Sequence, residues 1–277
     1  MKKIIVPVDF SKHSEYALKA AAMLAKENNA QIYALHMLDM IDGSLNESAN
    51  YQQEKTFFLL KLAEKNFNSF LKKDYLKDVK ITPIIKHFKV FSEVNEIAKN
   101  ENADLIIMGS HGASGLKEFF VGSNTEKVIR FSEIPVLVVK NELTDFNFEN
   151  VVFPTDFSDE IINTYVQAKE VVKDFNGSLH LLYVNTPYDS FKTSAEMENL
   201  AVNFLNKAEG NIDKLKEVNF ISDRTIEKGI LNFSNSVGAD LIAVSTHGRK
   251  GLSHVFKGSL SEDIANHANL PILTFKI

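Results

Sequence analysis

A glycine-rich segment of the chain combines residue types that bind phosphate. It reads Gly109-Ser110-His111-Gly112 and, after nine further residues, Gly122-Ser123. Glycine lets backbone N–H groups approach an anion closely, and a serine opening a helix adds a donor at the positive end of the helix dipole. The pattern indicates a phosphate-binding loop; the alternative is that the glycines only form turns.

A carboxylate follows an apolar run in each half of the chain. Asp9 lies in Pro7-Val8-Asp9-Phe10-Ser11, and Asp156 lies in Pro154-Thr155-Asp156-Phe157-Ser158. Ligands of open parallel sheets gather beyond the carboxyl ends of the strands, so these side chains are placed to meet one. The alternative is that each Asp caps the next helix, with Ser11 or Ser158 sharing that role.

The glycine segment also recurs, so the chain is an internal repeat. His247-Gly248 and Gly258-Ser259 repeat the earlier His-Gly and Gly-Ser pairs. The offset between copies falls from 147 at Asp156 to 136 at Pro271, so the second copy is shorter in its middle. We expect one domain over 1–140, a linker over 141–149 and a second domain over 150–277.

Short β-branched runs alternate with helical periodicity in both copies, as in parallel βαβ units. The predicted strands are 3–8, 31–38, 79–87, 104–109 and 135–139, then 151–153, 178–184, 220–227, 240–245 and 271–275. Ser11 is expected to cap a helix through Ala17, Ala21 and Leu24. Longer helices carry Leu60, Ala63, Phe67 and Phe70 in the first copy and Leu200, Phe204, Ala208 and Ile212 in the second. Such continuously apolar strands need helices on both faces of the sheet.

Composition narrows the functional class. The 277 residues are 44% hydrophobic and carry a net charge of -5, so two globular domains are expected and a nucleic-acid partner is not. The chain contains no cysteine, which fits a reducing compartment and excludes thiolate metal sites. No run reaches the roughly 18 apolar residues of a spanning helix, so a cytoplasmic protein without a membrane partner is expected.

The glycine-serine pattern after the fourth predicted strand, its recurrence and the repeated Asp-Phe-Ser segment together resemble the universal stress protein family. The resemblance covers essentially the whole chain, twice. It implies a doubly wound parallel α/β domain with strand order 3-2-1-4-5 that binds ATP, with or without Mg²⁺. The implied binding residues of the first copy are Asp9, Met37, Gly109, Gly112, Gly122 and Ser123.

The second copy has a matching set with one departure. Its residues are Asp156, Val184, Ser245, Gly248, Gly258 and Ser259. Ser245 stands where the family pattern has glycine, whereas Arg249 and Lys250 add basic groups to the second loop. In the family, the residue at the position of Met37 meets the base largely through its backbone, so the side chain at this position carries little information. The alternative is that Met37 and Val184 are only the last residues of buried strands.

Three functional classes fit the resemblance. The leading hypothesis is an ATP-binding stress-response regulator. The second is a weak ATPase or autophosphorylating enzyme, although the chain lacks a Walker G-x4-G-K-[ST] segment and any recognisable acid-base pair. The third is a nucleotide-free interaction module. Family members pair the fifth strand across a dimer, so we expect the fifth strands of this chain, 134–139 and 271–275, to pair with each other; the alternative is an ordinary edge strand that a loop covers. Association of two whole chains is a further expectation.

Overall fold

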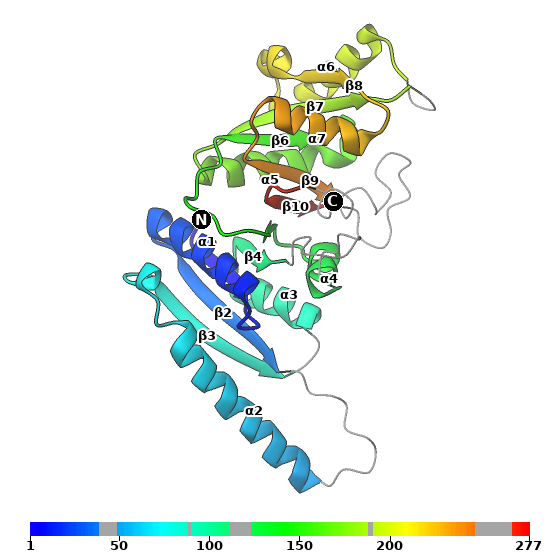
Figure 1. Cartoon of the computed structure of the whole chain (residues 1–277). Helices are drawn as coiled ribbons and strands as arrows, with labels where there is room; N and C mark the ends of the chain where they lie inside the picture. The colour runs from blue at the N-terminus through cyan, green and yellow to red at the C-terminus, as the bar shows by residue number, and fades with distance from the viewer. Residues whose placement is uncertain (39–48, 88–89, 111–122, 188–190, 247–267) are drawn as a thin grey trace. The chain divides into compact units, whose positions relative to one another are not determined.

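A computed structural model gives the structure of residues 1–38, 49–87, 90–110, 123–187, 191–246 and 268–277 (Figure 1). The chain divides into two compact units. The residues up to Asp145 fall mostly in the first unit, and those from Phe146 onward form most of the second. None of the helices in these ranges is long and apolar enough to cross a membrane.

The first half of the chain alternates strands and helices. In chain order its elements are β1 (Lys3–Pro7), α1 (Lys12–Asn28), β2 (Gln31–Leu38), α2 (Ala49–Phe70), the 3₁₀-helix η1 (Asp74–Leu76), β3 (Lys80–His87), α3 (Val90–Asn100), β4 (Leu105–Gly109), α4 (Ser123–Phe131) and β5 (Val136–Val139). The strand order is β3-β2-β1-β4-β5. Strand β1 pairs in parallel with both β2 and β4, with Ile4 opposite Ile32 and Leu105.

The second half repeats this plan, with shorter counterparts of α1, α2 and β3. Its elements are β6 (Asn150–Pro154), η2 (Asp159–Ile161), α5 (Ile162–Asp174), β7 (Ser178–Asn185), α6 (Ser194–Glu209), η3 (Asp213–Glu217), β8 (Asn219–Ser222), α7 (Ile226–Ser236), β9 (Leu241–Thr246) and β10 (Ile272–Lys276). The strand order is β8-β7-β6-β9-β10, again 3-2-1-4-5. The predicted fold class is therefore confirmed, and α6 is six residues shorter than α2.

Burial explains why these segments are strands of a covered sheet. Ile4, Ile5 and Val6 are consecutive in β1 and fully buried. Because neighbouring side chains of a strand point to opposite faces, this burial requires cover on both faces. Val151, Val152 and Phe153 of β6 are buried in the same way, so the helices must lie on both faces in each half.

Two sequence predictions for the second half extended too far. The strand predicted over 220–227 ends at Ser222, because Thr225 caps α7 by accepting a hydrogen bond from Lys228 N. Ile212 is not on the long helix and is 44% exposed. Helix α6 ends at Gly210, whose φ of 73° closes the last turn in the left-handed region.

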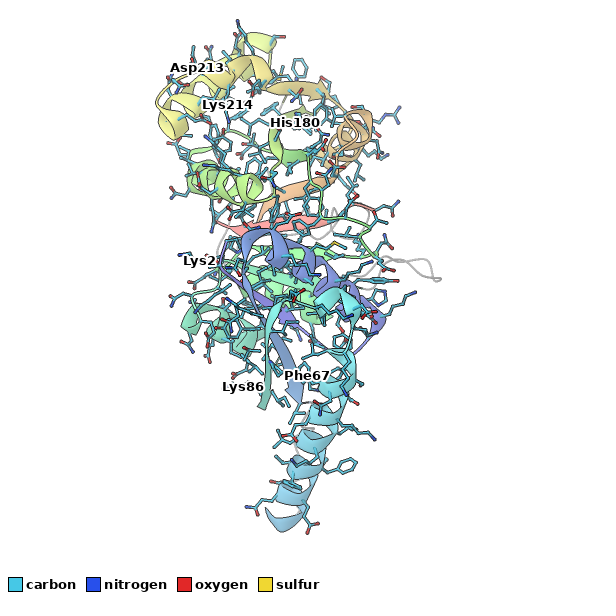
Figure 2. The ribbon with its side chains drawn as sticks, turned by 90° about the vertical axis from the view of Figure 1, so that its left-hand side faces the viewer. Lys2, Phe67, Lys86, His180, Asp213 and Lys214 are labelled. Atoms are coloured by element: carbon cyan, nitrogen blue, oxygen red, sulfur yellow. The ribbon has the colours of Figure 1, made fainter. Side chains whose placement is uncertain are left out.

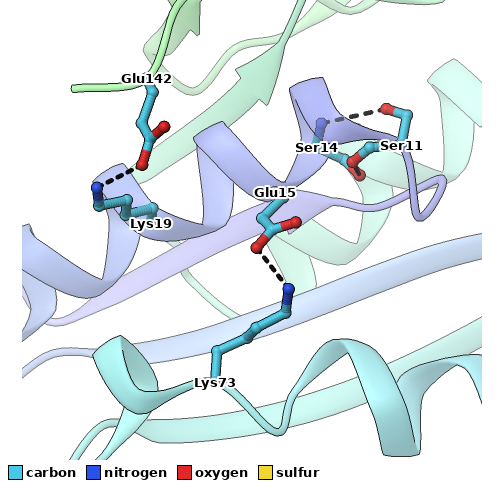
Figure 3. A network of polar contacts seen from close by, with 6 residues as sticks. All are labelled: Ser11, Ser14, Glu15, Lys19, Lys73 and Glu142. Atoms are coloured by element: carbon cyan, nitrogen blue, oxygen red, sulfur yellow. Dashed lines mark hydrogen bonds and ion pairs between the residues drawn. The ribbon is translucent and has the colours of Figure 1, made fainter.

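Polar contacts tie α1 to its neighbours within the first unit (Figure 3). The Lys73 ammonium lies 2.7 Å from a Glu15 carboxylate oxygen, and Lys19 lies 2.6 Å from Glu142. Ser11 accepts a hydrogen bond from Ser14 N at 3.2 Å, which confirms it as the N-cap of α1. Since Ser11 comes directly after the Asp-Phe pair, this network holds the start of α1 next to the predicted site.

Candidate nucleotide site at the carboxyl ends of the strands

Asp9 supports the turn between β1 and α1. Its Oδ1 accepts a hydrogen bond from Ser11 N at 3.0 Å, so the carboxylate braces the residue that caps the helix and is not itself the cap. Burial alone would raise the pKa of Asp9, but hydrogen bonds from Ser11 and Ser14 outweigh it and hold the pKa below its ordinary value. Asp9 is therefore a carboxylate at neutral pH.

The second unit builds the same turn. Asp156 Oδ1 accepts from Ser158 N at 2.9 Å, and Thr155 Oγ1 accepts from Phe157 N at 2.9 Å. Burial, followed by the nearby charge of Asp156, raises the pKa of Tyr183. The Asp156 carboxylate is thus close enough to Tyr183, on the neighbouring strand β7, to disfavour ionisation of its phenol.

Phenylalanine follows the carboxylate in both turns and has an unusual backbone. Phe10 has a φ of 64° and Phe157 a φ of 59°, in the left-handed region that bulky residues rarely adopt. Ring contacts hold them there: Phe10 lies 4.5 Å from the His36 ring, and Phe157 stacks on Tyr183 at 5.8 Å. Strained backbone of this kind gathers at functional sites when the surroundings fix it. The sequence signal for these residues was their repetition after each Asp.

A cavity of about 260 Å³ opens beside the Asp156 turn in the second unit. It lies at the carboxyl ends of β6 and β7. Its lining comprises Pro154, Thr155, Asp156, Phe157, Ser158, Leu182, Tyr183, Val184, Lys192, Leu200 and Ile226. The structure thus brings two of the predicted residues, Asp156 and Val184, into one cavity whose walls are otherwise mostly apolar.

Lys192 is a lining residue that sequence reasoning missed. The buried Asn185 side chain, at the end of β7, donates to Lys192 O at 2.9 Å and accepts from Lys192 N at 3.0 Å. This two-bond clamp fixes the backbone of Lys192, a basic residue that lines the cavity together with Asp156. Helix α7 packs closely against Val184, at the end of β7. A Cβ on Gly229 of α7 would lie only 2.5 Å from Val184 Cγ1, so this close packing requires glycine.

Gly109 ends β4 for a reason of packing. A Cβ there would lie 2.2 Å from His13 O, so the missing side chain admits the first turn of α1. Ser245 is the equivalent residue of β9; it is buried and its φ is not positive. The chain beyond Ser158 forms the 3₁₀-helix η2 in place of a regular first α-helical turn. In the second unit, therefore, serine replaces glycine at the end of the fourth strand, and the helix that follows the first strand begins differently, with η2 before α5.

The first turn of α4 is held against the end of β4. Thr125 is buried, and its hydroxyl donates to Gly109 O at 3.3 Å. Ser123 is the first residue of α4, as the phosphate-loop hypothesis requires. Backbone N–H groups at a helix start have no partner within the helix and suit an anion.

The remaining predicted residues fall into two groups. Met37 is 8% exposed and lies one residue before the end of β2, in keeping with a role through its backbone. The others lie outside the described residues: Gly112, Gly122, Gly248, Gly258, Ser259, and with them His111, His247, Arg249 and Lys250. The described parts of the chain contain no group of three or more His, Cys, Asp or Glu residues able to hold a metal ion.

Comparisons with known proteins agree with this architecture. The model of the universal stress protein family matches residues 1–140 and again 147–276. A universal stress protein of Methanocaldococcus jannaschii is 36% identical over 156 residues, covering 51% of this chain and 96% of its own. One from Bacillus subtilis is 32% identical over 145 residues, covering 50% and 98%. Each of these two relatives thus corresponds to about half of the chain.

A solved structure of the same family matches both halves together. The crystal structure of a universal stress protein from Archaeoglobus fulgidus is 25% identical, with a TM-score of 0.65. The match covers 99% of this chain and 98% of the other. The arrangement of two repeated α/β units in one chain is therefore shared with a solved protein.

Proposed function

The chain belongs to the universal stress protein family, and from this premise we propose that it is an ATP-binding regulatory protein. Each unit holds its nucleotide at the carboxyl ends of its first and fourth strands, with the base on the side of the first and second strands, where the cavity of the second unit lies, and the phosphates at the loop that follows the fourth strand. Occupancy by ATP changes the conformation or the association of the protein. The observation that carries this proposal is the cavity beside Asp156, because its lining combines apolar walls with one acidic and one basic residue.

The cavity has the chemistry that an adenine nucleotide needs. Val184, Leu200 and Ile226 provide apolar walls of the kind that enclose an aromatic base. A carboxylate such as Asp156 accepts hydrogen bonds from donors on a base or a ribose. Lys192 supplies a charge that attracts phosphate, since an ammonium donates charge-assisted hydrogen bonds.

The same assignment is proposed for the first unit. Asp9 occupies the equivalent turn, and its lowered pKa keeps it ionised as an acceptor. The first turn of α4, held to β4 by Thr125, offers backbone N–H donors to phosphate. We assign Gly112, Gly122 and Ser123 to the same phosphate loop, and Gly248, Gly258 and Ser259 to its counterpart.

Mass spectrometry of small molecules released from gently purified protein tests the proposal. ATP recovered in up to two equivalents per chain is the expected result. Recovery of ADP alone would favour the enzymatic class. If no nucleotide is recovered and calorimetric titration with ATP shows no heat of binding, the protein belongs to the nucleotide-free class and the proposal fails.

A further inference from the structure

Helix α2 exposes large apolar side chains that its own unit does not cover. Phe57 is 63% exposed, Phe58 is 65% exposed and Leu62 is 42% exposed. The turns of α2 before Phe67 extend past the ends of β2 and β3 in both views (Figures 1 and 2). Contiguous apolar residues at a surface commonly mark a contact with another molecule.

The exposed residues form one face of the helix. Glu54, Phe58 and Lys65 follow the spacing of four and then seven residues, which brings side chains to the same side of an α-helix, and all three are exposed. Phe57 and Leu62 flank this line on opposite sides. The buried face of the same helix carries Ala63, Phe67 and Phe70, so α2 is anchored by one side and apolar on the other.

We propose that this face of α2 binds the same face of α2 in a second copy of the chain, with the two helices antiparallel. Residues whose numbers add up to about 119 then face each other across a two-fold axis near residues 59 and 60. Phe58 of each copy packs against Leu62 of the other. Glu54 of each copy meets Lys65 of the other, so the apolar centre is closed at both ends by opposite charges.

The charges of Glu54 and Lys65 favour a second copy of the chain as the partner and an antiparallel orientation of the two helices. A parallel pair would set Glu54 beside Glu54 and Lys65 beside Lys65, and like charges at short distance repel. The antiparallel pair is self-complementary, as a two-fold interface requires. Lys61 lies over the Phe57 ring of its own helix at 5.7 Å and pairs with Glu64 at 2.8 Å, so its charge is already matched within the helix.

The small size of the face predicts a weak dimer. Three side chains exposed by 42 to 65% leave on the order of 300 Å² per chain, which is well below the roughly 800 Å² per partner of a stable interface. We therefore expect dimerisation that depends on protein concentration, in the micromolar to millimolar range.

Sedimentation equilibrium of the full chain tests this inference. Phe58→Glu should raise the dimer dissociation constant at least tenfold without changing the far-UV circular dichroism, because the side chain is 65% exposed. Phe191→Glu is the matched control, since Phe191 is 64% exposed but lies outside α2. It should leave the dissociation constant unchanged.

Charge reversal tests the antiparallel register. Glu54→Lys and Lys65→Glu should each weaken the dimer roughly tenfold, because two symmetric contacts become repulsive. The double variant should recover the wild-type constant within about threefold. A monomer at all concentrations, a dimer insensitive to Phe58→Glu, or single reversals without recovery in the double variant would each overturn the proposal. Binding of a different protein to this face, with no self-association, would also overturn it.

Discussion

Replacing Gly109 by alanine should destabilise the first unit even without any ligand. The new Cβ would lie 2.2 Å from His13 O, whereas ordinary contacts are 3.4 Å or longer. The first turn of α1 must therefore retreat by about 1 Å, in a close-packed interior that yields little. Overpacking of a core costs about 1–3 kcal/mol. We expect the upper end of this range, because the obstructing atom belongs to backbone and not to a flexible side chain.

Urea denaturation followed by circular dichroism measures this loss in the ligand-free protein. A loss of about 3 kcal/mol corresponds to a fall in Tm of roughly 6–12 °C. Ser245→Ala is the matched control, because it removes only a hydroxyl where the second unit already accommodates a Cβ. It should change the free energy of unfolding by less than about 1 kcal/mol.

Two results would refute this reasoning. If Gly109→Ala leaves the ligand-free stability within about 0.5 kcal/mol of the wild type and only weakens nucleotide binding, the glycine serves phosphate approach and not helix packing. If Ser245→Ala is as damaging as Gly109→Ala, the different start of the helix after Ser158 does not explain the departure at this position.

Three further substitutions separate the roles of charged groups. Lys192→Met should lower the ATP affinity of the second site about tenfold or more in calorimetric titration, with adenosine affinity unchanged; an equal loss for adenosine would exclude a phosphate contact. Burial lowers the pKa of Lys140 to about 8, so the unfolded chain holds this proton more tightly and stability should rise from pH 8 to 10.5. Lys140→Met should flatten that rise in urea denaturation, whereas a flat wild-type profile would contradict the assignment. Asp9→Asn keeps an acceptor for Ser11 N, so the free energy of unfolding should change by less than about 1 kcal/mol while nucleotide affinity falls roughly tenfold; unchanged affinity would leave Asp9 a purely structural role.

The fold was largely predictable because burial leaves a strong pattern in the strands. The strand over 31–38 was predicted with its observed bounds, since all of its residues except Gln31 and His36 are apolar and it lies between helical segments. The two wrong boundaries, of α6 and β8, lie next to residues that cap helices. Gly210 caps the end of α6 and Thr225 caps the start of α7. The sequence prediction extended the helix and the strand past these caps because apolar residues follow each of them.

The site was predictable only where sequence motifs carry it. Asp9 and Asp156 follow strands that are easily recognised, so their place at the sheet edge was foreseeable. The left-handed backbone of Phe157 was not, because bulky residues seldom adopt it and ring packing from distant segments enforces it. The clamp between Asn185 and Lys192 depends on a loop conformation that no residue spacing specifies.

The stack between Phe157 and Tyr183 also makes the second site optically observable. The chain contains no tryptophan, so no indole absorbs the emission of its tyrosines. The Tyr183 ring lines the cavity and lies next to a carboxylate, and both a stacked base and a shift of that carboxylate alter the emission of a phenol. If the second unit binds a nucleotide as proposed, its occupancy should change the tyrosine fluorescence of the unlabelled protein, and Tyr183→Phe should remove the part of that change that arises in the second unit.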